Sequence, residues 1–200
     1  PGNQTYHAVK TQIPSDWSAA AFPMVASVIT SSEVVIEGVD FLDSQGDKMV
    51  VDYLIGMGAD MVKEKEGHRL IIHGGKHLTG GTAIDLSDIP DSLPALSVAA
   101  LFAENDTTFT GLAHIRLKET DRVAVMEMEL KKAGAEIETG SDFMVVRGGR
   151  KIRGAEVNSH GDHRVAMALA VCGLAAEGTM TVDGGECAAV SFPSFFEKMK

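Results

Sequence analysis

The chain has 200 residues, 44% hydrophobic and 23% charged, a balance typical of a soluble globular protein with a sizeable core rather than of a disordered segment. Its formal net charge of −10 argues against nonspecific binding to nucleic acid or to an anionic membrane, although local cations can still bind small anions. Two cysteines are too few for a disulfide framework, and no run approaches the about 20 apolar residues of a membrane span, so we expect a cytoplasmic protein.

The chain starts at Pro1 without a methionine or the pattern of a signal peptide, and we interpret it as an excised piece or a processed product. Residues 15–39 predict an apolar helix followed by the β-rich stretch VVIEGV. A second helix is predicted from the pair Asp47-Lys48 to Gly58, because glycine commonly ends helices. The segment MVKEKEGHRLIIHGG that follows is typical of a β-hairpin.

The same order of elements is predicted again further along the chain. The Gly-rich stretch HGGKHLTGGT fits no phosphate-loop pattern, and we interpret it as a plain connector. Residues 90–112 predict a helix and the strand TTFTGL, and a helix with a strand-rich hairpin follows at residues 116–149. One face of this later helix carries apolar residues at spacings of 3, 4 and 3, namely Val123, Met126, Leu130 and Ala133.

A third copy begins at residue 161, where GDHRVAMALAVCGLAAEGTMTVDGG again predicts a helix and a strand. Asp16 and Asp91, which open the first two copies, are 75 residues apart (91 − 16), and the helix-ending Gly58 and Gly134 are 76 apart (134 − 58). We therefore predict an α/β fold of helix-strand units packed around a shared core, in a single domain of residues 1–200. The units cover about residues 15–75, 90–149 and 161–200, and the third lacks its second half.

A repeat of this kind brings equivalent helix N-termini together at one end of the domain. Helix N-termini attract phosphate and carboxylate groups through their free N–H groups and their partial positive charge. Asp16, Asp91 and Asp162 stand at the three starts, and each has the simple alternative role of an N-cap, which we favour for Asp16. For Asp91 and Asp162 the neighbouring cations make a functional role an equal alternative.

The segment RLKETDR, residues 116–122, holds three cations and two carboxylates at a predicted helix start. Arginine suits a bidentate grip on carboxylate or phosphate, and a carboxylate can serve as a general acid or base. A bare charge run of this kind is more often a solvated helix end. The pattern alone therefore leaves both interpretations open.

RLKETDR, GDHRVAMALA and the late ECAAVSFPSFFEKM together resemble the 5-enolpyruvylshikimate-3-phosphate (EPSP) synthase family, and the resemblance runs over the whole chain. It implies an inside-out α/β barrel of three repeats, as the C-terminal domain of a two-domain transferase whose N-terminal domain is absent here. It implies transfer of an enolpyruvyl group from phosphoenolpyruvate to the 5-hydroxyl of shikimate 3-phosphate, with release of phosphate, in the shikimate pathway to aromatic amino acids. No metal or organic cofactor is expected.

The resemblance also implies roles for individual residues. Asp91 matches the proton acceptor for the shikimate hydroxyl, and Glu119 matches the acid that protonates the methylene carbon of phosphoenolpyruvate. Lys118 would contact shikimate 3-phosphate, while Arg122 and Arg164 would hold phosphoenolpyruvate. Asp162 and His163, which lie beside Arg164 in the sequence, are expected to support this grip.

The chain departs from the family pattern at two positions. Many members have a lysine where this chain has Val190, which leaves one cation fewer for phosphoenolpyruvate. Many have an asparagine where this chain has His114. The family's other domain supplies further phosphate contacts, so we expect this chain to be inactive alone.

Three alternatives stay open from the sequence. The related enolpyruvyl transferase that acts on UDP-N-acetylglucosamine has a similar fold, but the KETDR cluster favours the shikimate branch. A non-catalytic binding domain would be favoured by a damaged Asp91 or Glu119, and both are intact. A zinc site is the third alternative, although its residues match no common zinc framework. Its ligands would be His160, His163, Cys172 and Cys187.

Overall fold

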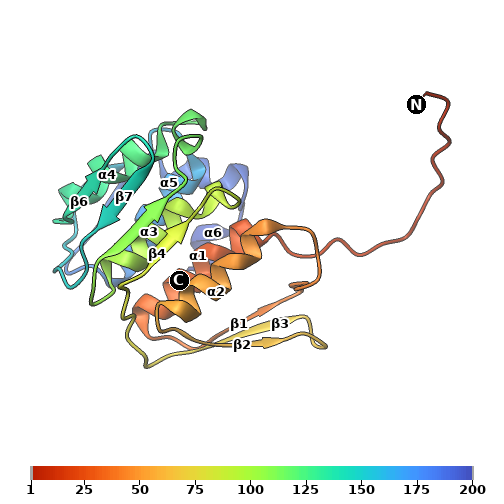
Figure 1. Cartoon of the computed structure of the whole chain (residues 1–200), viewed down its shortest axis with the longest axis horizontal. Helices are drawn as coiled ribbons and strands as arrows, with labels where there is room; N and C mark the ends of the chain where they lie inside the picture. The colour runs from red at the N-terminus through yellow and green to blue at the C-terminus, as the bar shows by residue number, and fades with distance from the viewer. Residues whose placement is uncertain (1, 200) are drawn as a thin grey trace.

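The computed structural model describes residues 2–199 as six α-helices, nine strands and four short 3₁₀ turns (Figure 1). The α-helices are α1 (Trp17–Thr30), α2 (Met49–Gly56), α3 (Leu93–Leu101), α4 (Arg122–Lys132), α5 (His163–Ala175) and α6 (Phe195–Lys198). The strands are β1 (Val34–Glu37), β2 (Asp60–Glu64), β3 (Arg69–His73), β4 (Ala83–Asp85), β5 (Thr107–Thr110), β6 (Ile137–Thr139), β7 (Phe143–Val146), β8 (Glu156–Asn158) and β9 (Thr181–Asp183). The turns are η1 (Gly46–Lys48), η2 (Pro90–Ser92), η3 (Ile115–Leu117) and η4 (Gly185–Val190).

Three helices, α1, α3 and α5, form the centre of the molecule, and each contacts the other two. They are the apolar runs of the three repeats, and all nine residues of α3 are buried. A helix that is apolar on every side is stable only where neighbours cover every side. Their many alanines let the helix axes approach closely. The core therefore lies among helices, and in Figure 1 the larger sheets lie outside them.

Short sheets cover this helical centre. The first has the order β1-β3-β2 and is antiparallel throughout. The second has the order β4-β5-β7-β6, in which only β4 and β5 run parallel. The third contains β8 and β9, which also run parallel. This arrangement confirms the predicted α/β fold with an inside-out distribution of helices and strands.

Most predicted elements are present. A strand follows the helix in α1-β1, α3-β5 and α5-β9, and both predicted hairpins form as β2-β3 and β6-β7. The predicted apolar face of α4 is fully buried. The sequence did not predict β4 and β8, two short strands that pair with β5 and β9. The stretch HGGKHLTGGT contains no helix and connects β3 to β4, as expected for a connector.

One backbone contact recurs in all three units. After the strand that follows each core helix, a glycine with positive φ packs directly against a serine hydroxyl, too close to admit a Cβ. The pairs are Ser15 with Gly38, Ser87 with Gly111 and Ser159 with Gly184. The serines are 72 residues apart (15, 87, 159) and the glycines 73 apart (38, 111, 184), so the repeat is present in the structure as well as in the sequence.

The segment before α1 differs from the rest of the chain. Residues 2–16 contain no helix or strand, and the N-terminal part extends away from the body (Figure 1). It joins the body at Ser15, whose N–H donates to the carbonyl of Gly38 at 2.9 Å. None of the helices within residues 2–199 combines the length and the apolar composition that crossing a membrane requires.

Candidate active site

The starts of the core helices meet and carry the predicted acidic residues. Asp16 is the N-cap of α1, where its carboxylate accepts hydrogen bonds from the N–H groups of Ser18 and Ala19. Asp162 is the N-cap of α5 and accepts from the N–H groups of its first turn. Asp91 is not a cap, because it lies inside η2, before α3 begins. The simple capping role thus describes Asp16 fully, Asp162 in part and Asp91 not at all.

The guanidinium of Arg122 lies at the centre of the cluster, and its side chain is 1% exposed. Nε donates to Asp162 at 2.7 Å, and Nη1 donates to Asp91 at 2.8 Å. Nη2 donates to Glu119 at 2.6 Å and to the second oxygen of Asp162 at 3.3 Å. Four hydrogen bonds from one buried side chain therefore join three carboxylates, which precede α3, α4 and α5.

Asp91 has the most cationic surroundings of the three carboxylates. Besides Arg122, Nζ of Lys118 lies 3.2 Å from one of its oxygens and Nη2 of Arg164 lies 3.3 Å from the other. Partial burial raises the pKa of Asp91, but the three cations outweigh it and hold the pKa below its usual value. Asp91 is therefore ionised at neutral pH, the state that a proton acceptor requires.

The pair of Arg122 and Asp162 is fully buried. Burial alone raises the pKa of Asp162, but the hydrogen bonds and charge of Arg122 and the two N–H groups of α5 lower it below the ordinary value. Burial lowers the pKa of Arg122, and its three carboxylate partners reverse this and raise it. Both groups stay charged, and such a pair resists separation because either charge left alone in the interior is costly.

Glu119 and Lys118 lie on the loop between η3 and α4. The side chain of Glu119 is 52% exposed, whereas Arg122 beside it is buried, so one face of Glu119 is open to solvent while the other is held by the guanidinium. Arg116 braces the loop from outside through two hydrogen bonds to Asp121, the N-cap of α4. The charged residues of RLKETDR therefore form two groups. Lys118, Glu119 and Arg122 belong to the cluster around Asp91, whereas Arg116 and Asp121 pair outside it.

The five predicted site residues, Asp91, Lys118, Glu119, Arg122 and Arg164, are thus linked by ion pairs into one cluster. Sequence reasoning missed two further members. Ser18 accepts a hydrogen bond from Nη2 of Arg164 at 2.9 Å, and Asp47 accepts one from Ser92 at 2.9 Å. Burial raises the pKa of Asp47. Comparing the polar residues just inside each repeated helix start would have pointed to Ser18 and to Ser92, the residue that donates to Asp47.

The remaining predicted positions lie around the cluster. His114 precedes η3 and is exposed, and Val190 at the end of η4 is 80% exposed. His163 is the first residue of α5 and is partly buried. The zinc alternative finds no support, since within residues 2–199 no three His, Cys, Asp or Glu side chains gather as a metal site would require. Cys172 is instead buried in α5.

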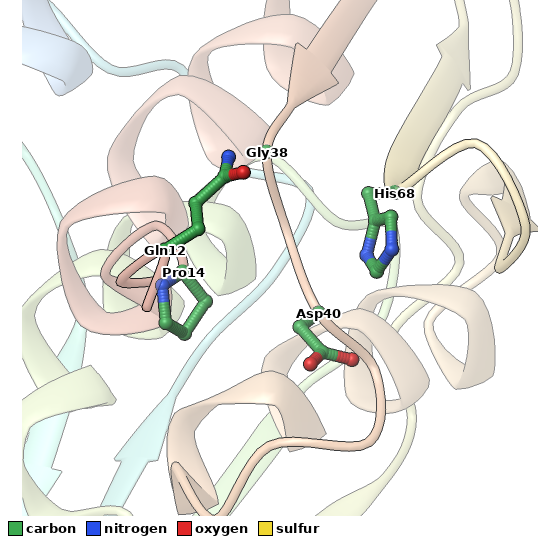
Figure 2. Close-up of a pocket in the computed structure, with 5 residues that line it drawn as sticks. All are labelled: Gln12, Pro14, Gly38, Asp40 and His68. Atoms are coloured by element: carbon green, nitrogen blue, oxygen red, sulfur yellow. The ribbon is translucent and has the colours of Figure 1, made fainter. Parts of the chain in front are cut away.

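A separate hollow of about 200 Å³ lies where the N-terminal segment meets the first sheet. Figure 2 shows its lining residues, which come from the N-terminal segment, the loop after β1 and the turn between β2 and β3. They are Gln12, Pro14, Gly38, Asp40 and His68. None of them belongs to the charged cluster, so this hollow is distinct from the candidate site.

Comparison with known proteins identifies relatives along the whole chain. Residues 1–199 match the family model described as EPSP synthase (3-phosphoshikimate 1-carboxyvinyltransferase). A 3-phosphoshikimate 1-carboxyvinyltransferase of Ruminiclostridium cellulolyticum is 43% identical over 200 residues, which is 100% of this chain and 46% of the relative. One of Methanocaldococcus jannaschii is 39% identical over 199 residues, with the same coverage. The chain therefore spans about half the length of the curated relatives it matches.

Solved structures agree with these relatives. An EPSP synthase from Acinetobacter baumannii matches with a TM-score of 0.82 and 36% identity, over 93% of this chain and 45% of the other. The enolpyruvyl transferase NikO from Streptomyces tendae matches with a TM-score of 0.74 over 94% of this chain and 42% of the other. At 19% identity the second match shows a shared fold alone.

Proposed function

The chain belongs to the EPSP synthase family, and on that premise we propose that it supplies part of an enzyme that transfers the enolpyruvyl group of phosphoenolpyruvate to the 5-hydroxyl of shikimate 3-phosphate. The observation that carries the proposal is the cluster in which Asp91 and Glu119 both contact Arg122 beside Lys118 and Arg164. Two carboxylates for proton transfer and three cations for two anionic substrates stand together there.

The reaction needs proton transfers at two places. The hydroxyl oxygen attacks the central carbon of phosphoenolpyruvate, and the methylene carbon gains a proton; loss of a proton from that carbon then restores the double bond as phosphate leaves. Asp91, which is ionised at neutral pH, accepts the hydroxyl proton. Glu119, whose side chain is half exposed, delivers the proton to the methylene carbon. The two carboxylates share the guanidinium of Arg122, so they can serve one reaction centre.

The cations oppose the repulsion between the two substrates. In the proposed reaction, Lys118 contacts shikimate 3-phosphate and Arg164 contacts phosphoenolpyruvate; their side chains are 31% and 12% exposed. Arg122 is buried and donates four of its five N–H groups to carboxylates, so a bidentate contact with phosphoenolpyruvate requires one of those carboxylates to move. Fixed cations of this kind supply both proximity and electrostatic stabilisation.

The partner we propose is the other half of the enzyme. The chain covers 46% of its relatives, and its charged cluster is built from the starts of helices and from loops. A second domain would complete the site and exclude water from it. We also propose a cytoplasmic location, which the two free cysteines favour.

The test uses an enzyme in which this chain is joined to the N-terminal half of the Ruminiclostridium cellulolyticum relative. Asp91→Ala and Glu119→Gln should each lower kcat at least about 100-fold without unfolding the protein, because each removes a proton-transfer group. Glu127→Gln is the matched control, since Glu127 lies on the same helix as Arg122 but pairs with Lys131 outside the cluster. Normal turnover in either site variant would remove that residue from the mechanism.

The chain alone should show little or no turnover under the same conditions. Turnover comparable to that of the joined enzyme would contradict the need for a second domain. A joined enzyme that turns over UDP-N-acetylglucosamine instead of shikimate 3-phosphate would favour the related branch of the fold. Binding of neither substrate by a folded protein would favour a non-catalytic domain.

A further inference from the structure

Three charged side chains are fully buried within residues 2–199, and two of them belong to the charged cluster of the candidate site. Arg122 and Asp162 belong to the cluster. The third is Glu129, which lies on α4 seven residues after Arg122 and therefore about two helical turns further along the same helix. A buried carboxylate costs free energy unless hydrogen bonds and charges compensate it. Its position beside the cluster requires an explanation.

Three groups compensate the charge of Glu129. Nζ of Lys132 lies 2.7 Å from Oε2, and the backbone N–H of Asn158 donates to the same oxygen at 2.9 Å. Nε2 of His160 lies 2.9 Å from Oε1. Burial raises the pKa of Glu129, but these donors lower it below the ordinary value. An ionised carboxylate can only accept, so Nε2 of His160 carries the hydrogen.

Two of these partners belong to one short loop, residues 158–162, which leads from β8 into α5. The loop is tightly wound: the N–H of His160 donates to the side chain of Asn158 at 2.6 Å, and the N–H of Asp162 donates to the carbonyl of Ser159 at 3.0 Å. His160 has φ of +52°, a left-handed conformation that a residue with a side chain adopts at a cost. The contact with Glu129 contributes to holding it there.

The loop ends at Asp162, the residue that bonds Nε of Arg122. Helix α4 therefore grips the same loop twice, once through Arg122 at its first residue and once through Glu129 two turns later. Ser159 fixes the other side of the loop, since its hydroxyl donates to the carbonyl of Gly184 at 3.0 Å. A change at Glu129 should displace Asp162 relative to Arg122, and Arg164 moves with Asp162 because they begin the same helix.

We infer that Glu129 is a positioning residue, which fixes loop 158–162 against α4 so that Asp162 and Arg164 reach Arg122 and Asp91. The inference rests on the proposed function only where it concerns the reaction, because the geometry it describes can be measured without substrates. A purely local role, in which Glu129 only fastens its own surroundings, would leave the carboxylates of the cluster unaffected. The two roles can therefore be separated by observing Asp162 directly.

The experiment follows the acid titration of the Asp162 carboxyl carbon by NMR in the 200-residue chain and its variants. Glu129→Gln should raise the pKa of Asp162 by about one unit, since an opposite charge in contact lowers a carboxyl pKa by roughly 1–3 units and a displaced loop loses part of that. His160→Gln should act in the same direction and is the milder variant, because the side chain of His160 is 35% exposed. The two changes together should raise the pKa by less than the sum of the single effects.

Glu127→Gln is the control, because Glu127 lies two residues before Glu129 on α4 but bonds Lys131 and Thr139 instead of the loop. It should leave the titration of Asp162 unchanged. An Asp162 pKa that is the same in Glu129→Gln, His160→Gln and the parent chain, all folded, would overturn the inference. If Glu129→Gln fails to fold, the pKa of Asp162 in His160→Gln alone tests the inference.

Kinetics of the joined enzyme connect the loop to the reaction. Glu129→Gln should lower kcat about 10-fold or more with a smaller change in KM, as expected when proton-transfer groups are misplaced. Unchanged kcat beside a raised Asp162 pKa would overturn the role in catalysis. A joined enzyme that is inactive even with the unmodified chain would count against the proposed function, and the NMR titration would still test the positioning of Asp162.

Discussion

Replacing Asp162 by asparagine removes one negative charge from the cluster while keeping the size of the side chain and its ability to cap α5, because asparagine and aspartate cap helices about equally well. The variant loses the ionic bonds to Nε and Nη2 of Arg122, at 2.7 and 3.3 Å, inside a fully buried pair. Removing one partner of a buried pair costs about 3–5 kcal/mol. Asp91 and Glu119 still contact Arg122, so we expect a loss of about 3 kcal/mol, at the lower end of that range.

Asp16→Asn is the matched control. Asp16 caps α1 as Asp162 caps α5, but it is exposed and bonds only the N–H groups and hydroxyl of its own helix start. Its replacement should cost no more than about 0.5 kcal/mol. The difference between the two variants therefore isolates the charge pair from the cap.

Urea unfolding measures both variants. The single tryptophan, Trp17, is fully buried in α1 and gives a fluorescence signal for the core. A loss of about 3 kcal/mol should also lower Tm by roughly 6–12 °C in a domain of this size. Equal losses in Asp16→Asn and Asp162→Asn would refute the reasoning, because the buried pair with Arg122 would then contribute nothing beyond the cap.

Three further outcomes are expected. The folded-state pKa values of Asp91 and Asp162 are below the ordinary value, so the unfolded chain binds more protons in acid. The free energy of unfolding, measured by urea titration, should therefore fall as the pH drops below about 5. It should fall less steeply in Asp162→Asn, which lacks one of these carboxylates. Burial raises the pKa of the Cys172 thiol to about 12, so a thiol reagent at pH 8 should modify only Cys187 until the protein is unfolded. Gly134→Ala, at φ of +92°, should cost at least about 1 kcal/mol in the same unfolding assay, and a neutral result would show that the helix end rearranges.

Much of the fold could be predicted because its signals are local. The apolar runs of α3 and α5 and the spacing of apolar residues on α4 depend only on neighbours in the sequence. The repeat then predicted that the helix starts carrying Asp91 and Asp162 would meet. The short strands β4 and β8 were not predictable in this way, because they are defined by their partners β5 and β9.

The sequence predicted which residues form most of the site, but it did not predict their contacts or burial. The sequence placed Arg122 among the substrate-binding cations, whereas the structure shows it buried and bonded to three carboxylates. Glu129 follows the pattern of an exposed helix residue, and its burial depends on Asn158 and His160, about 30 residues away in the sequence. Contacts over such distances leave no trace in local sequence patterns, so the burial of Arg122 and of Glu129 could be recognised only in the folded structure.

The hydrogen bonds that Arg122 donates to three carboxylates have a consequence for how an anionic substrate would bind. A phosphate or carboxylate that approaches the guanidinium meets carboxylates bonded to four of its five N–H groups, so a bidentate contact requires displacing one of them. Glu119 is the most exposed of the three carboxylates, so it is the easiest to displace from the guanidinium. Binding of the anion and release of the Glu119 carboxylate from Arg122 would then occur together. The proton-transfer group would become free only when the substrate is bound.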